Sequence, residues 1–185
     1  MKNQIRAGLL LQLKNLSSEE KSQKSISIET HLHTLLKNES GHWAGYNPLS
    51  DEPAIHWSQL SKNIEWCFPV AQDKTLQFKT ATKNHQISSL GIREPIDGEV
   101  IEPDEISGFV IPGVGFDKKG FRLGRGRGFY DRTLATYAGK KIGVCYAESL
   151  CEQLPHEEHD IRCQQVVTDK LIYQTGTSEG DSKWS

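Results

Sequence analysis

The sequence contains neither a long apolar run nor a paired-cysteine motif. No stretch approaches the ~18 apolar residues that a membrane span needs, and the N-terminus lacks the apolar region of a signal peptide. None of the four cysteines forms a C-x-x-C pair, which argues against a zinc site and against a redox motif. We therefore expect a soluble, cytoplasmic protein whose thiols are reduced and packed in or near the core.

The chain also has little net charge, because 22 Lys and Arg residues oppose 24 Asp and Glu residues. A value near zero is not typical of a general polyanion binder, so we expect no nucleic-acid partner. The 185 residues, 36% of them hydrophobic, suffice for one domain with a sizeable core. Because the last residues are rich in glycine, serine and acids, we expect this domain at residues 1–174 and a disordered tail at residues 175–185.

Two common nucleotide-binding motifs are missing as well. The P-loop pattern G-x-x-x-x-G-K-[ST] does not occur, and no glycine trio has the G-x-G-x-x-G spacing followed by an acid about 20 residues on. The chain has instead a basic segment at residues 110–134, with five glycines between Gly115 and Gly128. Between Asp117 and Arg132 it carries six basic residues against two acidic ones, within an acidic chain.

The order of elements around this segment, an apolar strand at residues 109–111, a glycine loop and a helix, is typical of an anion-binding site. Glycines let backbone N–H groups approach a phosphate closely. A disordered Gly/Arg RNA-binding tract is one alternative, but such tracts are long and lack a flanking strand and helix. A glycine-rich turn with solvated arginines is the other; it leaves the concentration of positive charge unexplained.

Hydrophobic periodicity outlines the rest of the chain. It predicts helices over residues 2–16, 52–62, 129–137 and 148–154. It also predicts a helix that begins at the capping pattern formed by Ser17 and Glu20. It predicts strands over residues 42–46, 64–68 (ended by Pro69), 109–111 and 141–146, a hairpin over 76–90, and a last strand from residues 166–167 and 171–173. The strand–helix–strand rhythm predicts a single three-layer α/β/α domain around a mainly parallel sheet with a side hairpin.

The runs Pro112 to Asp117 and Gly120 to Asp131 resemble the signature of 5-formyltetrahydrofolate cyclo-ligases, also called methenyltetrahydrofolate synthetases. The resemblance extends more weakly from Lys2 to about Thr168. It implies ATP-dependent closure of 5-formyltetrahydrofolate, including its polyglutamylated forms, to 5,10-methenyltetrahydrofolate, with release of ADP and phosphate. We expect a monomeric enzyme of one-carbon metabolism that uses ATP and Mg²⁺.

The resemblance also implies which residues form the site. ATP is assigned to Lys2, Arg6, Arg122, Leu123, Gly124, Arg125, Gly126, Arg127, Gly128, Phe129 and Tyr130, and among these Arg122, Arg125 and Arg127 are the expected catalytic residues. Folate is assigned to Asn47, Glu52, Phe78, Arg125, Gly126, Arg127, Gly128 and Phe129, with the turn from Gly91 to Pro95 near the pterin. Mg²⁺ is assigned to Asp131 and Asp160.

Some of these residues also have a simpler interpretation. Lys2 and Arg6 can belong to a solvated helix face, and Glu52 can be an acid that favours the start of a helix. His156 and His159 are expected to be surface residues, because two histidines three apart do not form a zinc site without further ligands.

The chain departs from the family pattern at Ser149, where a glutamine is common, and at Gln164, where the family usually has aspartate. A folate- or nucleotide-binding protein without turnover is therefore the alternative to the enzyme. The complete basic loop, the N-terminal basic pair and both carboxylates favour the enzyme.

Overall fold

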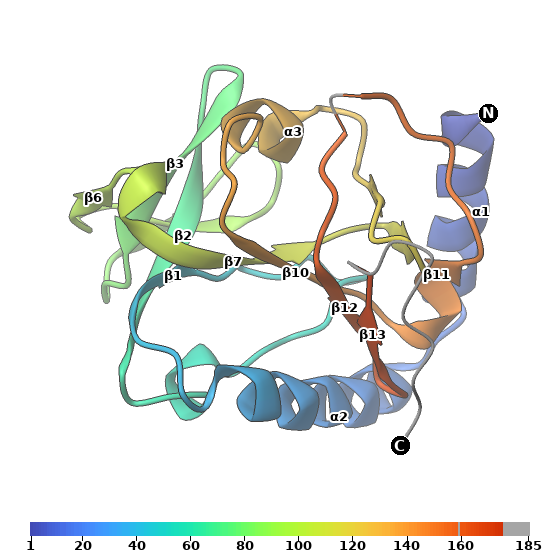
Figure 1. Cartoon of the computed structure of the whole chain (residues 1–185), viewed down its shortest axis with the longest axis horizontal. Helices are drawn as coiled ribbons and strands as arrows, with labels where there is room; N and C mark the ends of the chain where they lie inside the picture. The colour runs from blue at the N-terminus through green and yellow to red at the C-terminus, as the bar shows by residue number, and fades with distance from the viewer. Residues whose placement is uncertain (159, 176–185) are drawn as a thin grey trace.

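The computed structural model of the chain describes residues 1–158 and 160–175 (Figure 1). Of the predicted tail at residues 175–185, only Thr175 lies in this range. His159 lies outside it. No helix in the described ranges is both long and apolar enough to cross a membrane.

An eight-stranded sheet forms the centre of the molecule, in the order β13-β12-β10-β7-β1-β2-β3-β6. The five strands from β12 to β2 in this order run parallel, while β13, β3 and β6 pair antiparallel at the two edges. The predicted α/β class with a mainly parallel sheet is confirmed. The strand bounds are β1 Gly41–Ala44, β2 Ile64–Gln72, β3 Thr75–Thr80, β6 Val100–Ile101, β7 Ile106–Pro112, β10 Lys140–Val144, β12 Gln165–Val167 and β13 Ile172–Gln174.

The chain leaves the middle of this sheet in two opposite directions. From β1 it continues to β2 on one side, and from the adjacent β7 it continues to β10 on the other. Ligands of open parallel sheets bind outside the carboxyl ends of the strands where the strand order reverses in this way. The segments that follow β1 and β7 are therefore the expected walls of a binding site.

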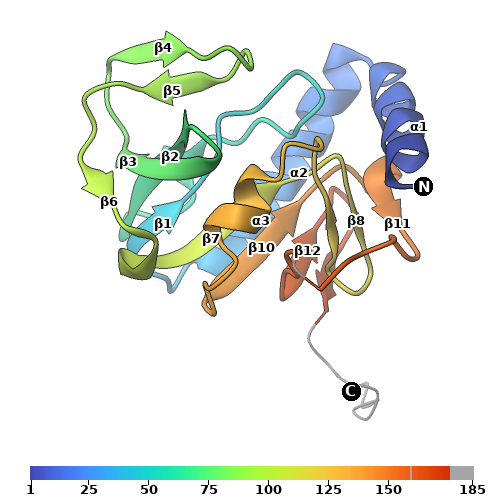
Figure 2. The same cartoon turned by 90° about the horizontal axis from the view of Figure 1, so that it is seen from above.

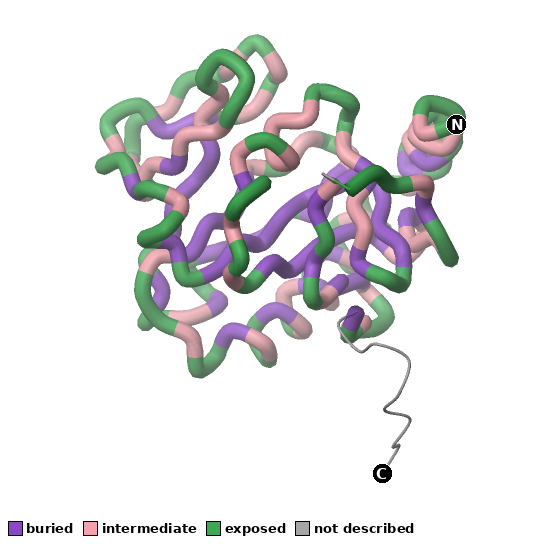
Figure 3. Tube along the Cα trace, turned by 45° about the horizontal axis from the view of Figure 1, so that its top comes forward, coloured by how far each residue is buried: buried purple, intermediate pink, exposed green. Residues whose placement is uncertain are grey.

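Helices cover both faces of the sheet (Figure 1). Helix α2 (Ser18–Leu36) packs on one face, and the short α3 (Phe129–Thr133) lies over the other. Helix α1 (Lys2–Lys14) lies beside them and contributes Leu9 to a small core cluster with Val114, Leu123 and Leu154. Figure 3 shows that burial is concentrated along the central strands.

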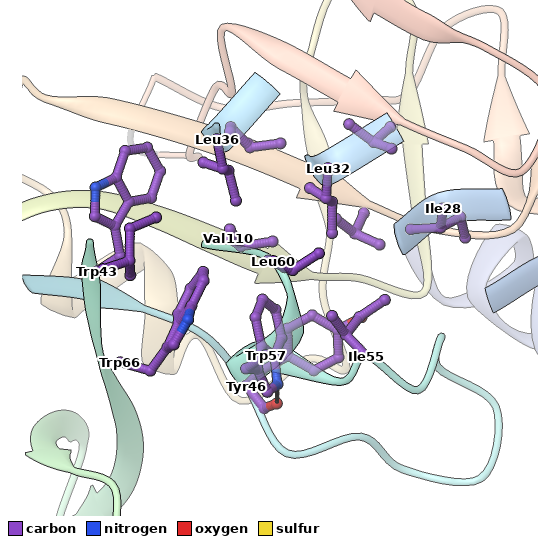
Figure 4. Close-up of a cluster of buried hydrophobic side chains, with 14 of the residues drawn as sticks. Ile28, Leu32, Leu36, Trp43, Tyr46, Ile55, Trp57, Leu60, Trp66 and Val110 are labelled. Atoms are coloured by element: carbon purple, nitrogen blue, oxygen red, sulfur yellow. Dashed lines mark hydrogen bonds between the residues drawn. The ribbon is translucent and has the colours of Figure 1, made fainter. Parts of the chain in front are cut away.

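The core beneath the sheet joins α2 to aromatic side chains of β1 and β2 (Figure 4). Ile28, Leu32 and Leu36 fall on one face of α2, as the predicted helical spacing requires. They face Trp43 of β1, which is fully buried, and Trp66 of β2, which is 8% exposed. This packing fixes the start of the segment that leaves β1 toward the binding site.

Two small sheets complete the fold, and one of them corrects the predicted hairpin at residues 76–90. The strand predicted there pairs with β2 and β6 as β3, whereas the actual side hairpin joins β4 (His85–Ile87) to β5 (Arg93–Pro95). The other sheet, in the order β11-β8-β9, gives regular structure to part of the glycine segment. It consists of β8 Gly115–Asp117, β9 Arg122–Leu123 and β11 Leu150–Cys151.

Three predicted helices are wrong in length or kind because tertiary contacts outweigh local propensity. The helix predicted at residues 52–62 is a single 3₁₀ turn, η1 (Trp57–Gln59), since the Trp57 indole N–H donates to the carbonyl of Tyr46 and draws the segment into the core. The one predicted at residues 148–154 is a 3₁₀ turn, η3 (Ala147–Ser149), followed by β11, which pairs with β8. The one predicted at residues 129–137 ends at Thr133.

Strand β2 also continues through Pro69 to Gln72, although we predicted that Pro69 ends it. Its pairing with β1 stops at Cys67, so beyond that residue β3 is its one paired strand within residues 1–158 and 160–175. A proline is tolerated where one edge of a strand is unpaired.

The capping box that starts α2 gives a first testable prediction. The Ser17 hydroxyl accepts from the backbone N–H of Glu20 at 3.2 Å, and the Glu20 carboxylate accepts from the backbone N–H of Ser17 at 2.8 Å. We expect Ser17→Ala to lower the free energy of unfolding by about 1 kcal/mol, measured by denaturant titration. Ser22→Ala, on the exposed face of the same helix, is the control and should change stability little.

Candidate functional site

A cavity of about 440 Å³ lies where the topology predicts it. Its walls come from the segment after β1, the glycine segment after β7, the ends of β2 and β3, the side hairpin and the α1–α2 connection. The lining residues are Lys14, Lys21, Tyr46, Asn47, Leu49, Ser50, Asp51, Glu52, Pro69, Ala71, Leu76, Leu90, Ile92, Glu94, Pro112, Arg122, Gly124, Arg125, Arg127, Gly128, Phe129 and Tyr130.

The glycine segment presents free backbone donors beside this cavity. Gly126 and Gly128 have φ angles of 92° and 64°, a conformation that side-chain-bearing residues rarely adopt. Within the described residues, the backbone N–H groups of residues 125–128 donate no hydrogen bond to the protein. Consecutive unpaired N–H groups of this kind form an anion-binding concavity.

Arg125 ties the glycine segment to the segment after β1. Its guanidinium forms ion pairs with Asp51 and with Glu52, the latter at 3.2 Å. Burial raises the pKa of Glu52 above its usual range, and a hydrogen bond from the Leu49 N–H and the charge of Arg125 offset this only in part. The ion pairs with Arg125 therefore favour the charged form of this carboxylate and act against the effect of burial.

The other two arginines of the segment differ in how firmly they are held. Arg122 donates from Nε to the carbonyl of Pro112 at 2.7 Å, and its guanidinium lies 4.8 Å from the centre of the Tyr130 ring. Arg127 is exposed, and within the described residues its side chain forms no hydrogen bond or ion pair. Its charge is thus available to a ligand without breaking a contact.

The two residues of the N-terminal basic pair lie outside the cavity lining and have different partners. Arg6 donates from Nε to the carbonyl of Gly124 at 2.7 Å. Lys2 pairs with Asp160 at 2.5 Å, and although burial acts to lower the pKa of Lys2, the hydrogen bond and charge of Asp160 raise it overall. Asp131 accepts from the backbone N–H of Ile161 at 3.3 Å, next to Asp160. The fold thus brings the N-terminal helix into contact with Gly124 through Arg6 and with Asp160 through Lys2.

Two predicted site residues belong to the core instead of the cavity wall. Phe78, predicted near the pterin, is 1% exposed and packs edge-on against Phe109 with ring centres 5.1 Å apart. The side chain of Leu123 is 2% exposed and fills the cluster under α1. Asn47 does line the cavity, and its amide donates to the carbonyl of Arg93 in the side hairpin at 2.6 Å.

The sequence patterns did not reveal every polar group of the cavity. Lys14, Lys21 and Asp51 line it although none was predicted to be in the site, whereas Glu94 lies in the turn from Gly91 to Pro95 that was expected near the pterin. Lys14 ends α1 and Lys21 lies in the first turns of α2, and the burial of Glu94 depends on pairing between β4 and β5, which local periodicity did not show.

Comparisons with known proteins identify the family and the fold of this chain. A family model described as the 5-formyltetrahydrofolate cyclo-ligase family matches residues 1–169. The 5-formyltetrahydrofolate cyclo-ligase of Haemophilus influenzae is 31% identical over 86% of this chain and 93% of that protein, and the mouse protein of the same description is 28% identical over 90% and 92%. The structure of the Aquifex aeolicus 5,10-methenyltetrahydrofolate synthetase superposes with a TM-score of 0.83, at 28% identity, over 98% of this chain and 96% of that one. A 5,10-methenyltetrahydrofolate synthetase from Mycoplasma pneumoniae gives a TM-score of 0.75 at 26% identity, over 91% and 98%.

Proposed function

Because this chain belongs to the 5-formyltetrahydrofolate cyclo-ligase family, we propose that its cavity holds 5-formyltetrahydrofolate against ATP bound on the glycine segment. The chain is an ATP-dependent ligase of one-carbon metabolism that forms 5,10-methenyltetrahydrofolate. This arrangement rests on one observation: residues 122–130 provide both a wall of the cavity and a run of backbone N–H groups that have no acceptor among the described residues.

The chemistry explains why the two substrates must meet there. A formamide is a poor electrophile, and its oxygen is a poor leaving group. Transfer of the γ-phosphoryl group breaks its bond to ADP and forms a bond to the formyl oxygen. N10 then attacks the formyl carbon and loses its proton, and the C–O bond breaks as inorganic phosphate leaves. This sequence needs positioning and charge neutralisation more than a protein nucleophile.

The basic groups around the glycine segment suit that task. The N–H groups of residues 125–128 and Arg127, whose side chain has no partner among the described residues, are available to the phosphates, and Arg122 is positioned by its hydrogen bond to Pro112. Arg6 supports the back of the segment through Gly124. Phosphoryl transfer is accelerated mainly by such preorganised charge.

The residues also fit Mg²⁺, provided that ATP supplies the remaining ligands. Within the described ranges no group of three His, Cys, Asp or Glu side chains is placed to hold a metal. Asp131 accepts a hydrogen bond from the backbone of Ile161, the residue after Asp160, and Mg²⁺ is commonly held by one or two acids together with phosphates and water. When bound, the ion would neutralise charge on the transferring phosphoryl group. Lys2 would have to move from Asp160 toward the phosphates.

Replacing Asp160 should therefore change the dependence on Mg²⁺. In Asp160→Asn we expect ADP formation to require a several-fold higher Mg²⁺ concentration, because the amide keeps the shape but lacks the charge that holds a hard cation. Glu158→Gln, at an exposed neighbouring position, is the control. An Mg²⁺ titration identical to that of the unaltered protein would assign Asp160 a structural role as the partner of Lys2.

Lys14 and Lys21 are placed to receive the glutamate part of the substrate. Both line the cavity at the α1–α2 connection; Lys21 donates to the carbonyl of Ser50 at 3.1 Å, and the Lys14 side chain forms no hydrogen bond or ion pair within the described residues. We propose that their charges attract the tail carboxylates, including those of polyglutamylated substrates.

Lys14→Gln should accordingly raise KM for a polyglutamylated substrate by roughly three- to ten-fold, since a partly exposed charge pair is worth about 1 kcal/mol. The effect should fade at high salt, and kcat and KM for ATP should not change. Lys62→Gln, which alters an exposed lysine away from the cavity, provides the comparison. Equal KM values in the two variants would place the tail elsewhere.

The proposed function is tested by following ADP release and methenyl absorbance in parallel while ATP, Mg²⁺ and folate are omitted in turn. We expect both products in equal amounts, and only when all three are present. Tight folate binding without ADP or chromophore would favour the non-catalytic alternative. Ser149 and Gln164, the departures on which that alternative rests, do not line the cavity.

A further inference from the structure

Three acidic side chains line the cavity, and they differ in their partners. Asp51 and Glu52 are both paired with Arg125. Glu94 forms no ion pair with any described residue of the chain. The cavity therefore contains one carboxylate whose charge the protein leaves unmatched.

Glu94 is also deeply placed. It lies on β5 and is 4% exposed. One carboxylate oxygen accepts from the backbone N–H of Ala71 at 3.1 Å, and no second donor reaches the carboxylate from within residues 1–158 and 160–175. Burying a carboxylate with so few hydrogen bonds costs free energy. A ligand that brings N–H donors to this carboxylate therefore gains binding free energy.

The surroundings of Glu94 indicate the shape of that ligand. Pro69, Ala71, Leu76 and Ile92 contribute apolar surface to the same cavity. The Asn47 amide holds the backbone of the side hairpin against this wall through the Arg93 carbonyl. Apolar surface next to the one carboxylate that has no ion pair among the described residues favours a compact ring that has N–H donors along one edge.

We propose, on the basis of the function above, that Glu94 binds the pterin ring of the folate by accepting hydrogen bonds from N3–H and the 2-amino group. These two donors are adjacent and nearly parallel, so they match a carboxylate as a guanidinium does. Figure 2 shows the side hairpin on one side of the molecule and α1 with the start of α2 on the other. With its pterin at Glu94, the folate would extend its glutamate tail toward Lys14 and Lys21. The formyl group would then lie between these two ends of the cavity, next to the glycine segment.

The proposal is tested by calorimetric binding of two ligands in the absence of ATP, so that turnover plays no part. The ligands are 5-formyltetrahydrofolate and its analogue in which a methyl group replaces the 2-amino group. We expect the unaltered protein to bind the parent roughly ten- to a hundred-fold more tightly than the analogue, and Glu94→Gln to bind the two with nearly equal affinity. Glu99→Gln, at an exposed position close by, should keep the full preference.

Two results would overturn the assignment. If Glu94→Gln retains the preference for the 2-amino group, or lowers the affinity for both ligands by the same factor, Glu94 does not contact that edge of the ring. Should the variant fail to fold, a less than two-fold preference in the unaltered protein would be equally decisive. Failure of the proposed function is separate, because it would appear as folate binding with the expected preference but without ADP or methenyl product.

Discussion

Arg125→Ala is expected to lower the free energy of unfolding by about 2 kcal/mol at neutral pH. The value lies below the 3–5 kcal/mol typical of fully buried pairs, because the Arg125 side chain is 35% exposed whereas that of Glu52 is 8% exposed. The loss arises mainly from the buried Glu52 carboxylate, which would keep its hydrogen bond from Leu49 but lose its cation.

This loss should depend on pH in a defined direction. Burial already raises the pKa of Glu52 in the folded protein, and removing Arg125 raises it further. A carboxyl group with a raised pKa binds its proton more tightly when folded, so stability increases as the pH falls through that pKa. The deficit of Arg125→Ala should therefore be largest at about pH 8 and smaller at about pH 5.

Denaturant titrations of both proteins at these two pH values measure the effect. Arg125→Lys, which keeps the charge but not the forked geometry, should recover part of the stability. A deficit that stays constant across the pH range would mean that the ion pair with Glu52 is not what stabilises the segment after β1.

Arg127→Ala is expected to reduce kcat/KM for ATP roughly ten- to a hundred-fold. Losing one charge-assisted contact to a phosphate typically costs ~1.5–3 kcal/mol, and Arg127 has no competing partner among the described residues. Its exposed side chain supports no core packing, so the thermal unfolding temperature should not change.

Steady-state kinetics with ATP as the varied substrate provide the measurement. Lys119→Ala removes an exposed basic residue that lies outside the cavity lining, and serves as the matched control. Equal effects of the two substitutions would show that only the general positive charge of the region matters.

The sequence predicted the centre of this protein better than its periphery. The strand at residues 109–111 and the capping box at Ser17 are determined by local patterns, and both are confirmed in β7 and α2. The helix predicted at residues 52–62 is wrong because Trp57 and Tyr46 interact through a hydrogen bond that periodicity does not reveal. Periodicity likewise could not show that the strand at 75–80 pairs with β2 and β6.

The candidate site shows the same limit. The basic loop and its glycines were recognisable because the motif is contiguous, whereas Lys14 and Lys21 reach the cavity from two separate helices. Phe78 is the opposite case. It was predicted to contact the ligand, but it is buried in the core and packs against Phe109. Whether a side chain reaches a cavity depends on strand pairing and packing, and local sequence patterns predict neither.

The central claim is that ATP, bound on the glycine segment, transfers its γ-phosphoryl group to the formyl oxygen of the folate in the adjacent cavity. Substrate labelled with ¹⁸O in the formyl group tests this most directly. The account predicts that each turnover places the labelled oxygen in inorganic phosphate, which mass spectrometry detects. Unlabelled phosphate, with the ¹⁸O released into water, would contradict it.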